Sequence, residues 1–231
     1  MSEKIIKFET EISPIIAKQF GPKCFGGTED QNLGFDDEKL VSEDCLSLNI
    51  WRTANSIDAP EGLPVLVFIH GGAYFMGTGS DPRLNGELLA LEQEVVVVTI
   101  NYRLGPWGFY YNPDLLTDQS ASSNFGLLDQ IEALKWVSKF IKYFRGNPDN
   151  ITLGGCSAGS QSIMAHMVQQ TDELLFHKAL LLSPPTGIEY YTAEEALYIY
   201  ENVASRLNCD RYYSDLGRVY SPSPPDGAKL K

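Results

Sequence analysis

The stretch GCSAG, residues 155–159, decides the fold of this chain. It follows a short apolar run at 151–155 that is typical of a strand, and it precedes a helical pattern at 158–170. A G-x-S-x-G pattern between a strand and a helix indicates a nucleophile elbow, a turn that needs glycines beside a strained serine. Such a turn places the Ser157 hydroxyl above the sheet, at the positive end of the helix dipole. The same five letters also occur in plain strand-to-helix turns, so a second motif has to support the interpretation.

The second motif is HGGA, residues 70–73, which ends the apolar run at 64–69. Backbone N–H groups in a loop of this kind can bind an oxyanion, because small residues let the backbone approach the substrate oxygen. A glycine-rich turn without this role is the alternative. Two such motifs, each at the end of a core strand and in this order, favour a serine hydrolase.

The remaining pattern consists of strands that alternate with helices. Such alternation predicts an α/β fold with a mostly parallel sheet and helices on both faces. Thr192 and Glu195 form a capping-box pattern, and the sequence GNP at 146–148 is a helix stop. Strands are expected at 45–51, 64–69, 95–100, 151–155 and 178–182, and helices at 127–144, 158–170 and 192–207.

Composition excludes several classes of function. The 231 residues carry a net charge of −12, which is unfavourable for nucleic-acid binding. The apolar runs are far shorter than the roughly 18 residues that a membrane span needs, so no span is expected. The four cysteines form no C-x-x-C pair and have no histidine at zinc-ligand spacing, so we expect no metal and no other cofactor.

Four longer blocks carry a specific family resemblance. They are 43–51 (EDCLSLNIW), 97–105 (VVTINYRLG), 124–136 (NFGLLDQIEALKW) and 144–159 (FRGNPDNITLGGCSAG). Together they resemble the type-B carboxylesterase family, which includes carboxylesterases and cholinesterases, over about residues 21–209. The resemblance implies an α/β-hydrolase fold and the hydrolysis of a small-molecule carboxylic ester through a serine acyl-enzyme.

By the same resemblance Ser157 is the nucleophile, and the backbone N–H groups of Gly72, Ala73 and Ala158 form the oxyanion hole. Cys24 and Cys45 occupy the positions of the family's first disulfide. Buried thiols in a reducing compartment are the alternative for these two cysteines. The charged N-terminus has no apolar segment of a signal peptide, which indicates a cytoplasmic protein for the chain as written, whereas family members are often secreted or lie in the lumen of the endoplasmic reticulum.

The chain departs from the family because it has no recognisable catalytic acid and base after the serine. Members of the family are much longer, and their acid and histidine follow the serine in chain order. We therefore expect a chain truncated at both ends, with a partial α/β-hydrolase domain at 1–209 and a loose tail at 210–231. His166 lies too far along the helix, His177 precedes the next strand, and His70 more often braces the oxyanion loop than acts as a base.

Two local features bear on the substrate. Cys156 stands where cholinesterases carry glutamate, and the segment 24–45 contains Phe35 but no tryptophan. A general carboxylic ester is therefore favoured over a choline ester. Two interpretations of Cys156 are open: it is a small buried residue, or it is a substitute nucleophile. The first is favoured. The segment 74–76 (Tyr-Phe-Met) lines either an acyl pocket or the core.

Two functions follow from these patterns. The first is a carboxylic-ester hydrolase of the family, with little activity in this chain because the acid and base are absent. The second is a non-catalytic remnant or an interaction protein that uses the same fold. The strand at 178–182 is expected to form an open sheet edge, which favours aggregation or chaperone binding.

Overall fold

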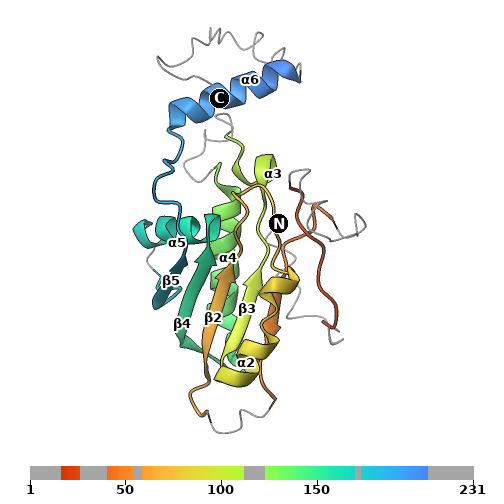
Figure 1. The fold of residues 1–231 in the computed structure, drawn as a ribbon, viewed down its shortest axis with the longest axis vertical. Helices are drawn as coiled ribbons and strands as arrows, with labels where there is room; N and C mark the ends of the chain where they lie inside the picture. Colours follow the sequence, from red (N-terminus) through yellow and green to blue (C-terminus); the bar gives the residue numbers. More distant parts are fainter. Residues whose placement is uncertain (1–16, 27–40, 55–58, 112–122, 170–172, 208–231) are drawn as a thin grey trace.

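A five-stranded sheet forms the centre of the molecule in the computed structural model (Figure 1). The structure describes residues 17–26, 41–54, 59–111, 123–169 and 173–207. The strand order is β1-β3-β2-β4-β5, and every neighbouring pair except β1·β3 is parallel. The mostly parallel sheet expected from the sequence is confirmed. The strands are β1 (Leu48–Trp51), β2 (Leu63–Ile69), β3 (Val96–Ile100), β4 (Gly146–Cys156) and β5 (Lys178–Leu182).

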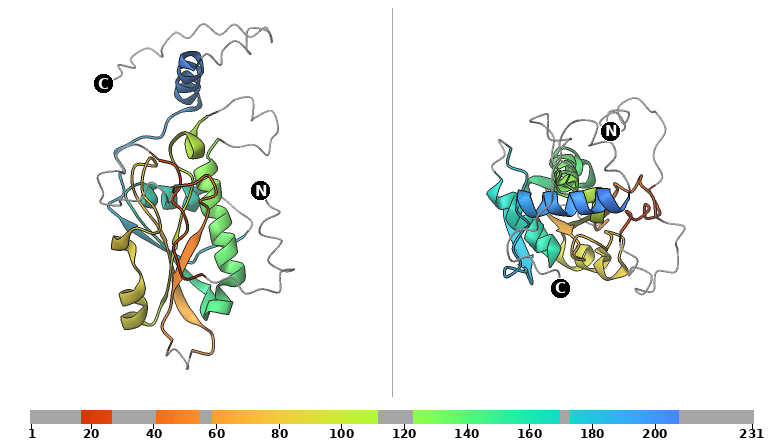
Figure 2. Two further views of the ribbon diagram at one scale, coloured as in Figure 1. Left: turned by 90° about the vertical axis from the view of Figure 1, so that its right-hand side faces the viewer. Right: turned by 90° about the horizontal axis from the view of Figure 1, so that it is seen from above.

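Helices cover both faces of this sheet. Figure 2 shows α2 and α4 on opposite sides of the strands, and α5 packs against β4 and β5. Helix α6 lies beyond the carboxyl ends of the parallel strands β2–β5 (Figure 1), and the Tyr110 hydroxyl donates a hydrogen bond to the carbonyl of Tyr200 in α6. The helices are α2 (Glu87–Gln93), α3 (Gly105–Phe109), α4 (Phe125–Phe140), α5 (Ala158–Val168) and α6 (Ala193–Arg206), with 3₁₀ turns η4 (Pro82–Leu84) and η6 (Ile141–Phe144).

Burial follows strand position. All five residues of β3 are buried, as expected of a strand that is covered on both faces. In β2 only alternate residues are buried: Leu63, Val65, Val67 and Ile69 belong to the core. The second face of β2 is therefore less completely covered than its apolar sequence indicates.

Several boundaries differ from the sequence expectation: the strand expected at 45–51 begins at Leu48, and the strand expected at 151–155 already begins at Gly146. The helix expected at 127–144 ends at Phe140 and tightens into the 3₁₀ turn η6. Arg145 then adopts a left-handed conformation with φ 64°, which ends the turn before Gly146 is reached. The GNP sequence consequently lies in β4 and is not the stop of the helix. Apolar spacing alone does not distinguish the last α-helical turn from a 3₁₀ turn.

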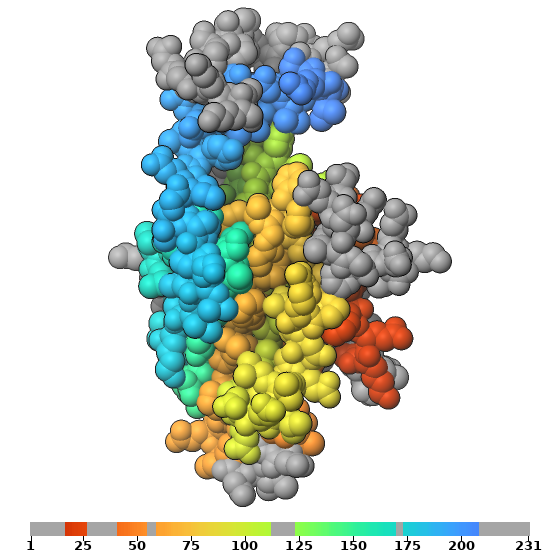
Figure 3. All heavy atoms as spheres, in the orientation of Figure 1, coloured from red at the N-terminus to blue at the C-terminus, as the bar shows by residue number. Residues whose placement is uncertain are grey.

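The last strand of the sheet is exposed. Within the described residues β5 pairs with β4 alone, and four of its five residues are exposed. Leu180 and Leu182 each keep 43% of their surface accessible. In Figure 3 the blue band that includes β5 lies at the surface on the left-hand side. The open edge that the sequence predicts is present in the described part of the chain.

Further expectations concern the C-terminal tail, a membrane-spanning helix and the start of α6. The tail at 210–231 lies outside the described residues, as does Cys209. No helix in the described ranges combines the length and the apolar character that a membrane crossing requires. Thr192 and Glu195 form the capping box of α6, as the sequence predicts.

Candidate active site

Ser157 lies at a sharp turn between β4 and α5. Its backbone has φ 54° and ψ −119°, a conformation that residues with a side chain rarely adopt. Its N–H donates a hydrogen bond to the carbonyl of Leu182 in β5 (2.9 Å), and its carbonyl accepts one from the N–H of Gln161 (3.0 Å). The turn therefore has the strained strand-to-helix geometry of a nucleophile elbow.

The two glycines of the GCSAG motif make this turn sterically feasible. A Cβ atom on Gly155 would lie 2.7 Å from the carbonyl carbon of Gly159. A Cβ atom on Gly159 would overlap the carbonyl oxygen of Ile69, at the end of β2. Both positions need glycine because backbone meets backbone there. The close approach brings the start of α5 next to the loop that follows β2.

That loop contains the HGGA motif and lies against the elbow. A Cβ atom on Gly71 would be 3.2 Å from the Cβ atom of Ser157. Gly72, Ala73 and Tyr74 have positive φ angles of 117°, 54° and 62°. The loop thus turns sharply beside the serine, and Ala73 is exposed. The structure thus places Gly71, in the loop that contains the predicted oxyanion residues Gly72 and Ala73, next to Ser157.

His70 is buried behind this loop. Its Nδ1 atom lies 2.8 Å from the carbonyl oxygen of Gly71, and its ring stacks on Tyr102 with centroids 4.4 Å apart. The Tyr102 hydroxyl donates a hydrogen bond to the backbone carbonyl of His70 (3.0 Å). Burial lowers the pKa of His70 to about 4, against the opposing effects of the Gly71 hydrogen bond and the Asp81 charge.

The other two histidines are engaged elsewhere. His166 in α5 lies with Nε2 2.7 Å from Oε1 of Gln130, and burial lowers its pKa to about 4. The Nδ1 atom of His177 accepts a hydrogen bond from the N–H of Ile151 (3.1 Å). All three histidines of the sequence are described, and among the described residues no hydrogen bond joins an imidazole to the Ser157 hydroxyl.

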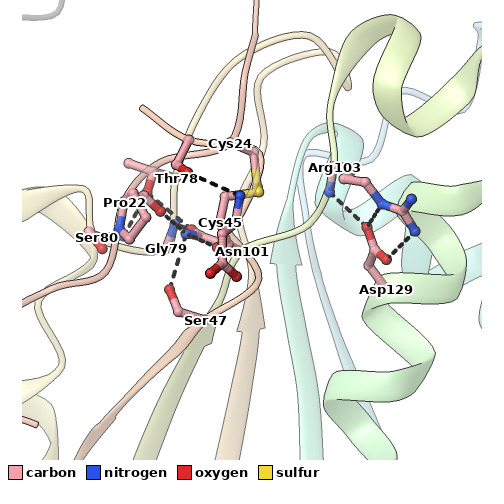
Figure 4. The surroundings of a disulfide bond; sticks show 12 residues. Pro22, Cys24, Cys45, Ser47, Thr78, Gly79, Ser80, Asn101, Arg103 and Asp129 are labelled. Carbon is pink, nitrogen blue, oxygen red and sulfur yellow. Dashed lines mark hydrogen bonds and ion pairs between the residues drawn. A yellow bond between two sulfur atoms is a disulfide. The ribbon is translucent and has the colours of Figure 1, made fainter. Parts of the chain in front are cut away.

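Cys24 and Cys45 form a disulfide, so the alternative of two buried thiols is wrong. Asn101, at the end of β3, lies beside it (Figure 4). Its Oδ1 accepts hydrogen bonds from Thr78 Oγ1 (3.1 Å) and Gly79 N–H (2.8 Å). Its Nδ2 donates to the carbonyls of Pro22 and Cys45, both at 3.0 Å, and to Ser47 Oγ at 3.4 Å. The residue joins the disulfide to the segment that follows the oxyanion loop.

Sequence reasoning missed this role of Asn101, and it also missed an ion pair nearby. The guanidinium of Arg103 contacts the carboxylate of Asp129 in α4 through two hydrogen bonds of 2.7 Å each. The backbone N–H of Arg103 donates to the same carboxylate (3.0 Å). Figure 4 shows this pair on the helix side of the disulfide. Both residues belong to family-like blocks, which was the only signal for them in the sequence.

The residues near the serine in the chain and after the oxyanion loop differ in how far they are buried. Of the segment 74–76, Tyr74 packs against the core beside Phe109, whereas Phe75 is half exposed. Cys156 is a partly exposed thiol and forms no disulfide. Two hollows among the described residues lie elsewhere, one near Gly62 and one between the disulfide and Trp107. The described ranges also contain no cluster of three or more ligating side chains suited to a metal ion.

The mostly parallel sheet, the strained serine after β4 and the loop after β2 define an α/β-hydrolase fold. The chain belongs to the carboxylesterase family, whose model matches residues 12–220. A para-nitrobenzyl esterase of Bacillus subtilis (strain 168) is 43% identical over 168 residues, which are 72% of this chain and 33% of that protein. An acylcarnitine hydrolase of Mus musculus is 41% identical over 183 residues, which are 77% of this chain and 31% of that protein.

A solved structure agrees with these relatives. A thermophilic PNB esterase superposes with a TM-score of 0.72 at 38% identity, over 85% of this chain and 40% of that one. The chain spans about a third of the length of the curated relatives that it matches. The family is therefore established for this chain.

Proposed function

We propose that this chain acts on carboxylic esters through a covalent acyl group on Ser157. The observation that carries the proposal is the strained backbone of Ser157, at φ 54° and ψ −119°, with the loop at Gly71 packed against it. A strained backbone lowers the stability of the fold, so such conformations persist mainly at functional sites, where the surrounding structure enforces them. The names of the relatives, para-nitrobenzyl esterase and acylcarnitine hydrolase, support an ester as substrate.

In the proposed reaction, Ser157 Oγ attacks the carbonyl carbon of the ester. The π electrons of the carbonyl move to its oxygen, and the N–H groups of Gly72, Ala73 and Ala158 stabilise the resulting oxyanion. Collapse of the tetrahedral intermediate breaks the bond between the carbonyl carbon and the alcohol oxygen; the alcohol leaves with the proton that the Ser157 hydroxyl gave up, and an acyl-serine remains. Water then attacks the acyl carbon, the bond to Ser157 Oγ breaks, one proton of the water returns to Oγ, and the carboxylic acid is released. The positive end of α5 favours the same negative charge.

No imidazole of this chain is assigned to the proton transfer. His70, His166 and His177 all hold other hydrogen bonds. A serine hydroxyl without a neighbouring base is a weak nucleophile, and loss of triad members costs several orders of magnitude in rate. We therefore expect turnover by this chain to be slow, and acylation to be detected more readily than turnover.

The test is covalent labelling of the chain with a fluorophosphonate, followed by mass spectrometry of the modified peptide. We expect one label, on Ser157, and none in Ser157→Ala. Hydrolysis of p-nitrophenyl butyrate is measured in parallel, with Ser157→Ala as background. A wild-type protein that is folded by circular dichroism yet neither labels nor exceeds that background would refute the proposal.

A non-catalytic interaction role is the second candidate. The engagement of all three histidines away from Ser157 favours it, as does the exposed apolar edge at β5. An unpaired strand edge is a template for pairing with another chain, so this candidate includes self-association and chaperone binding. The labelling experiment distinguishes the candidates, because a binding protein has no need of a reactive serine.

The disulfide supports a proposal about location. Disulfides persist in oxidising compartments and are rare in the cytosol. We propose that the protein resides outside the cell or in the lumen of the endoplasmic reticulum, where the Cys24–Cys45 bond is stable. Fractionation of cells, followed by non-reducing electrophoresis, tests this location. Detection of the reduced protein in the cytosol alone would contradict it.

A further inference from the structure

The sequence contains a single acceptor pattern for N-linked glycosylation. Asn150, Ile151 and Thr152 fit the pattern N-x-S/T, and every other asparagine of the chain lacks a serine or threonine two positions later. A folded protein can carry a glycan only where the asparagine amide reaches the surface, because the oligosaccharide is bulky and stays in water. The pattern spans the first half of the central strand β4, so its surroundings decide whether it can be used.

The pairing of β4 with β2 is interrupted where the pattern begins. Gly146 and Ile151 pair with residues of β2 that are only two positions apart, so residues 147–150 lie opposite a single residue of β2. Extra residues of this kind leave the ladder and form a bulge. Asn150 is the last residue of this bulge. It therefore lies outside the paired part of β4, although it belongs to the strand.

The side chain of Asn150 leaves its amide nitrogen available. Oδ1 accepts a hydrogen bond of 2.6 Å from Nζ of Lys178, an exposed residue at the start of β5. Within the described ranges Nδ2, the atom that would carry the glycan, has no hydrogen bond. Ile151 is fully buried, whereas Asn150 and Thr152 on either side of it are partly exposed. Since alternate residues of a strand share a face, the two polar residues lie on the opposite side from Ile151.

Two further features fit a glycan at this position. Six residues of extended strand, 151–156, separate Asn150 from Ser157, so the two residues lie roughly 20 Å apart at opposite ends of the paired part of β4. The attachment point is therefore remote from the candidate active site. The Cys24–Cys45 disulfide indicates an oxidising compartment, and the lumen of the endoplasmic reticulum is such a compartment.

We propose that Asn150 is N-glycosylated when the chain enters the lumen of the endoplasmic reticulum. A transferase of the cell moves the oligosaccharide from a lipid diphosphate donor. The bond between the anomeric carbon and a diphosphate oxygen breaks, and a bond between that carbon and Asn150 Nδ2 forms. Nδ2 loses one proton to a base of the transferase, and the lipid diphosphate leaves. The inference goes beyond ester hydrolysis and depends on the proposed location.

The test directs the full chain into the secretory pathway of mammalian cells with an added, cleavable signal peptide. Thr152→Ser keeps the acceptor pattern, whereas Thr152→Val removes only the hydroxyl at nearly the same shape, and Asn150→Gln removes the acceptor. We expect wild type and Thr152→Ser to lose the mass of one glycan after digestion with PNGase F. The other two variants should be insensitive. An insensitive wild type, or a glycan on Thr152→Val, would overturn the inference.

The gel shift is read on cells and medium together, so a poorly secreted variant still reports. Digestion in heavy-oxygen water then identifies the acceptor, because PNGase F converts the glycosylated asparagine to aspartate with one oxygen from water. We expect this label on residue 150 alone, and a label at any other residue would overturn the inference.

A last comparison asks whether the glycan is compatible with the fold. Glycosylated wild type and Asn150→Gln should both show the Cys24–Cys45 disulfide in non-reducing electrophoresis and a cooperative thermal transition. If only Asn150→Gln shows them, the fold does not accommodate the glycan and the inference fails. If neither form folds, the label on residue 150 decides alone. None of these measurements uses the reactivity of Ser157, so their failure is distinct from failure of the proposed function.

Discussion

Gly159 packs directly against the carbonyl oxygen of Ile69, so closely that a methyl group at residue 159 would overlap that oxygen. This contact joins the first turn of α5 to the end of β2. It therefore fixes how near the elbow comes to the oxyanion loop. Any side chain at this position has to push two rigid backbone segments apart.

Gly159→Ala should lower the free energy of unfolding by about 1–3 kcal/mol, the usual cost of overpacking. Gly187→Ala is the matched control, because a Cβ atom there meets nothing within 4 Å. Urea denaturation of both variants checks the difference. If the two midpoints agree, the close approach is not a real constraint.

Replacing the strained serine should separate stability from chemistry. Ser157→Gly relieves the positive φ, whose cost is of order 1–3 kcal/mol, although glycine itself costs about 0.5–1 kcal/mol in the unfolded chain. Ser157→Ala keeps the strain. We expect a higher melting temperature for the Gly variant than for the Ala variant, and loss of phosphonate labelling in both. If the melting temperature of the Gly variant is equal to or lower than that of the Ala variant, the backbone at Ser157 is not strained.

Asn101→Ala should destabilise the fold by about 3 kcal/mol, since it leaves several buried partners without a hydrogen bond. Asn85→Ala serves as the control, because that side chain is exposed and accepts a hydrogen bond from Glu87 N–H. Thermal unfolding under non-reducing conditions keeps the disulfide intact in both variants. Similar melting temperatures for the two would argue against the importance of the network.

Acidification should weaken the fold through its buried histidines. The pKa values of His70 and His166 are about 4 in the folded chain and near 6.5 when unfolded. The unfolded chain therefore binds more protons between these values, and stability is lost as the pH falls from about 6.5 to 4. Each ring contributes up to about 3 kcal/mol.

Urea midpoints at pH 7.5 and pH 5.0 measure this effect, because their difference lies within that window. His166→Gln should reduce the difference, since one titrating ring is gone. A difference that stays the same in His166→Gln would show that other groups carry the pH dependence.

The exposed edge at β5 should promote association between copies of the chain. Leu180→Lys places a charge on the edge, as natural edge strands do, and should lower the apparent mass in light scattering at high protein concentration. Leu91→Lys makes the same change on α2, where Leu91 is 59% exposed. If both substitutions, or neither, shift the mass, the edge is not the site of association.

The elbow and the oxyanion loop could be predicted because each is a short, contiguous motif with one geometric solution. The strands could be predicted as well, since β3 and β5 are apolar runs bounded by polar residues. The α-helical end at Phe140 could not, because apolar residues continue at the same spacing through the 3₁₀ turn.

The Asn101 network was also beyond reach from the sequence. Its partners Pro22, Cys45 and Thr78 lie 79, 56 and 23 residues away in the chain. No local pattern marks an asparagine whose partners come from such distant segments, because they meet only after the sheet has formed. The bond from His70 to Gly71 is local, but its meaning depends on the loop geometry that surrounds it.

The strand order has a consequence for synthesis on the ribosome. β2 and β3 are close in the chain and pair directly, whereas β4 joins the free side of β2 and β5 then joins β4. Each later strand therefore extends an existing edge, and none has to be inserted between strands that are already paired. At every stage the emerging sheet offers a ready template to the next strand, and equally to a neighbouring nascent chain. The pace of translation after β4 thus sets how long β4, the strand before Ser157, keeps an unpaired edge before β5 joins it.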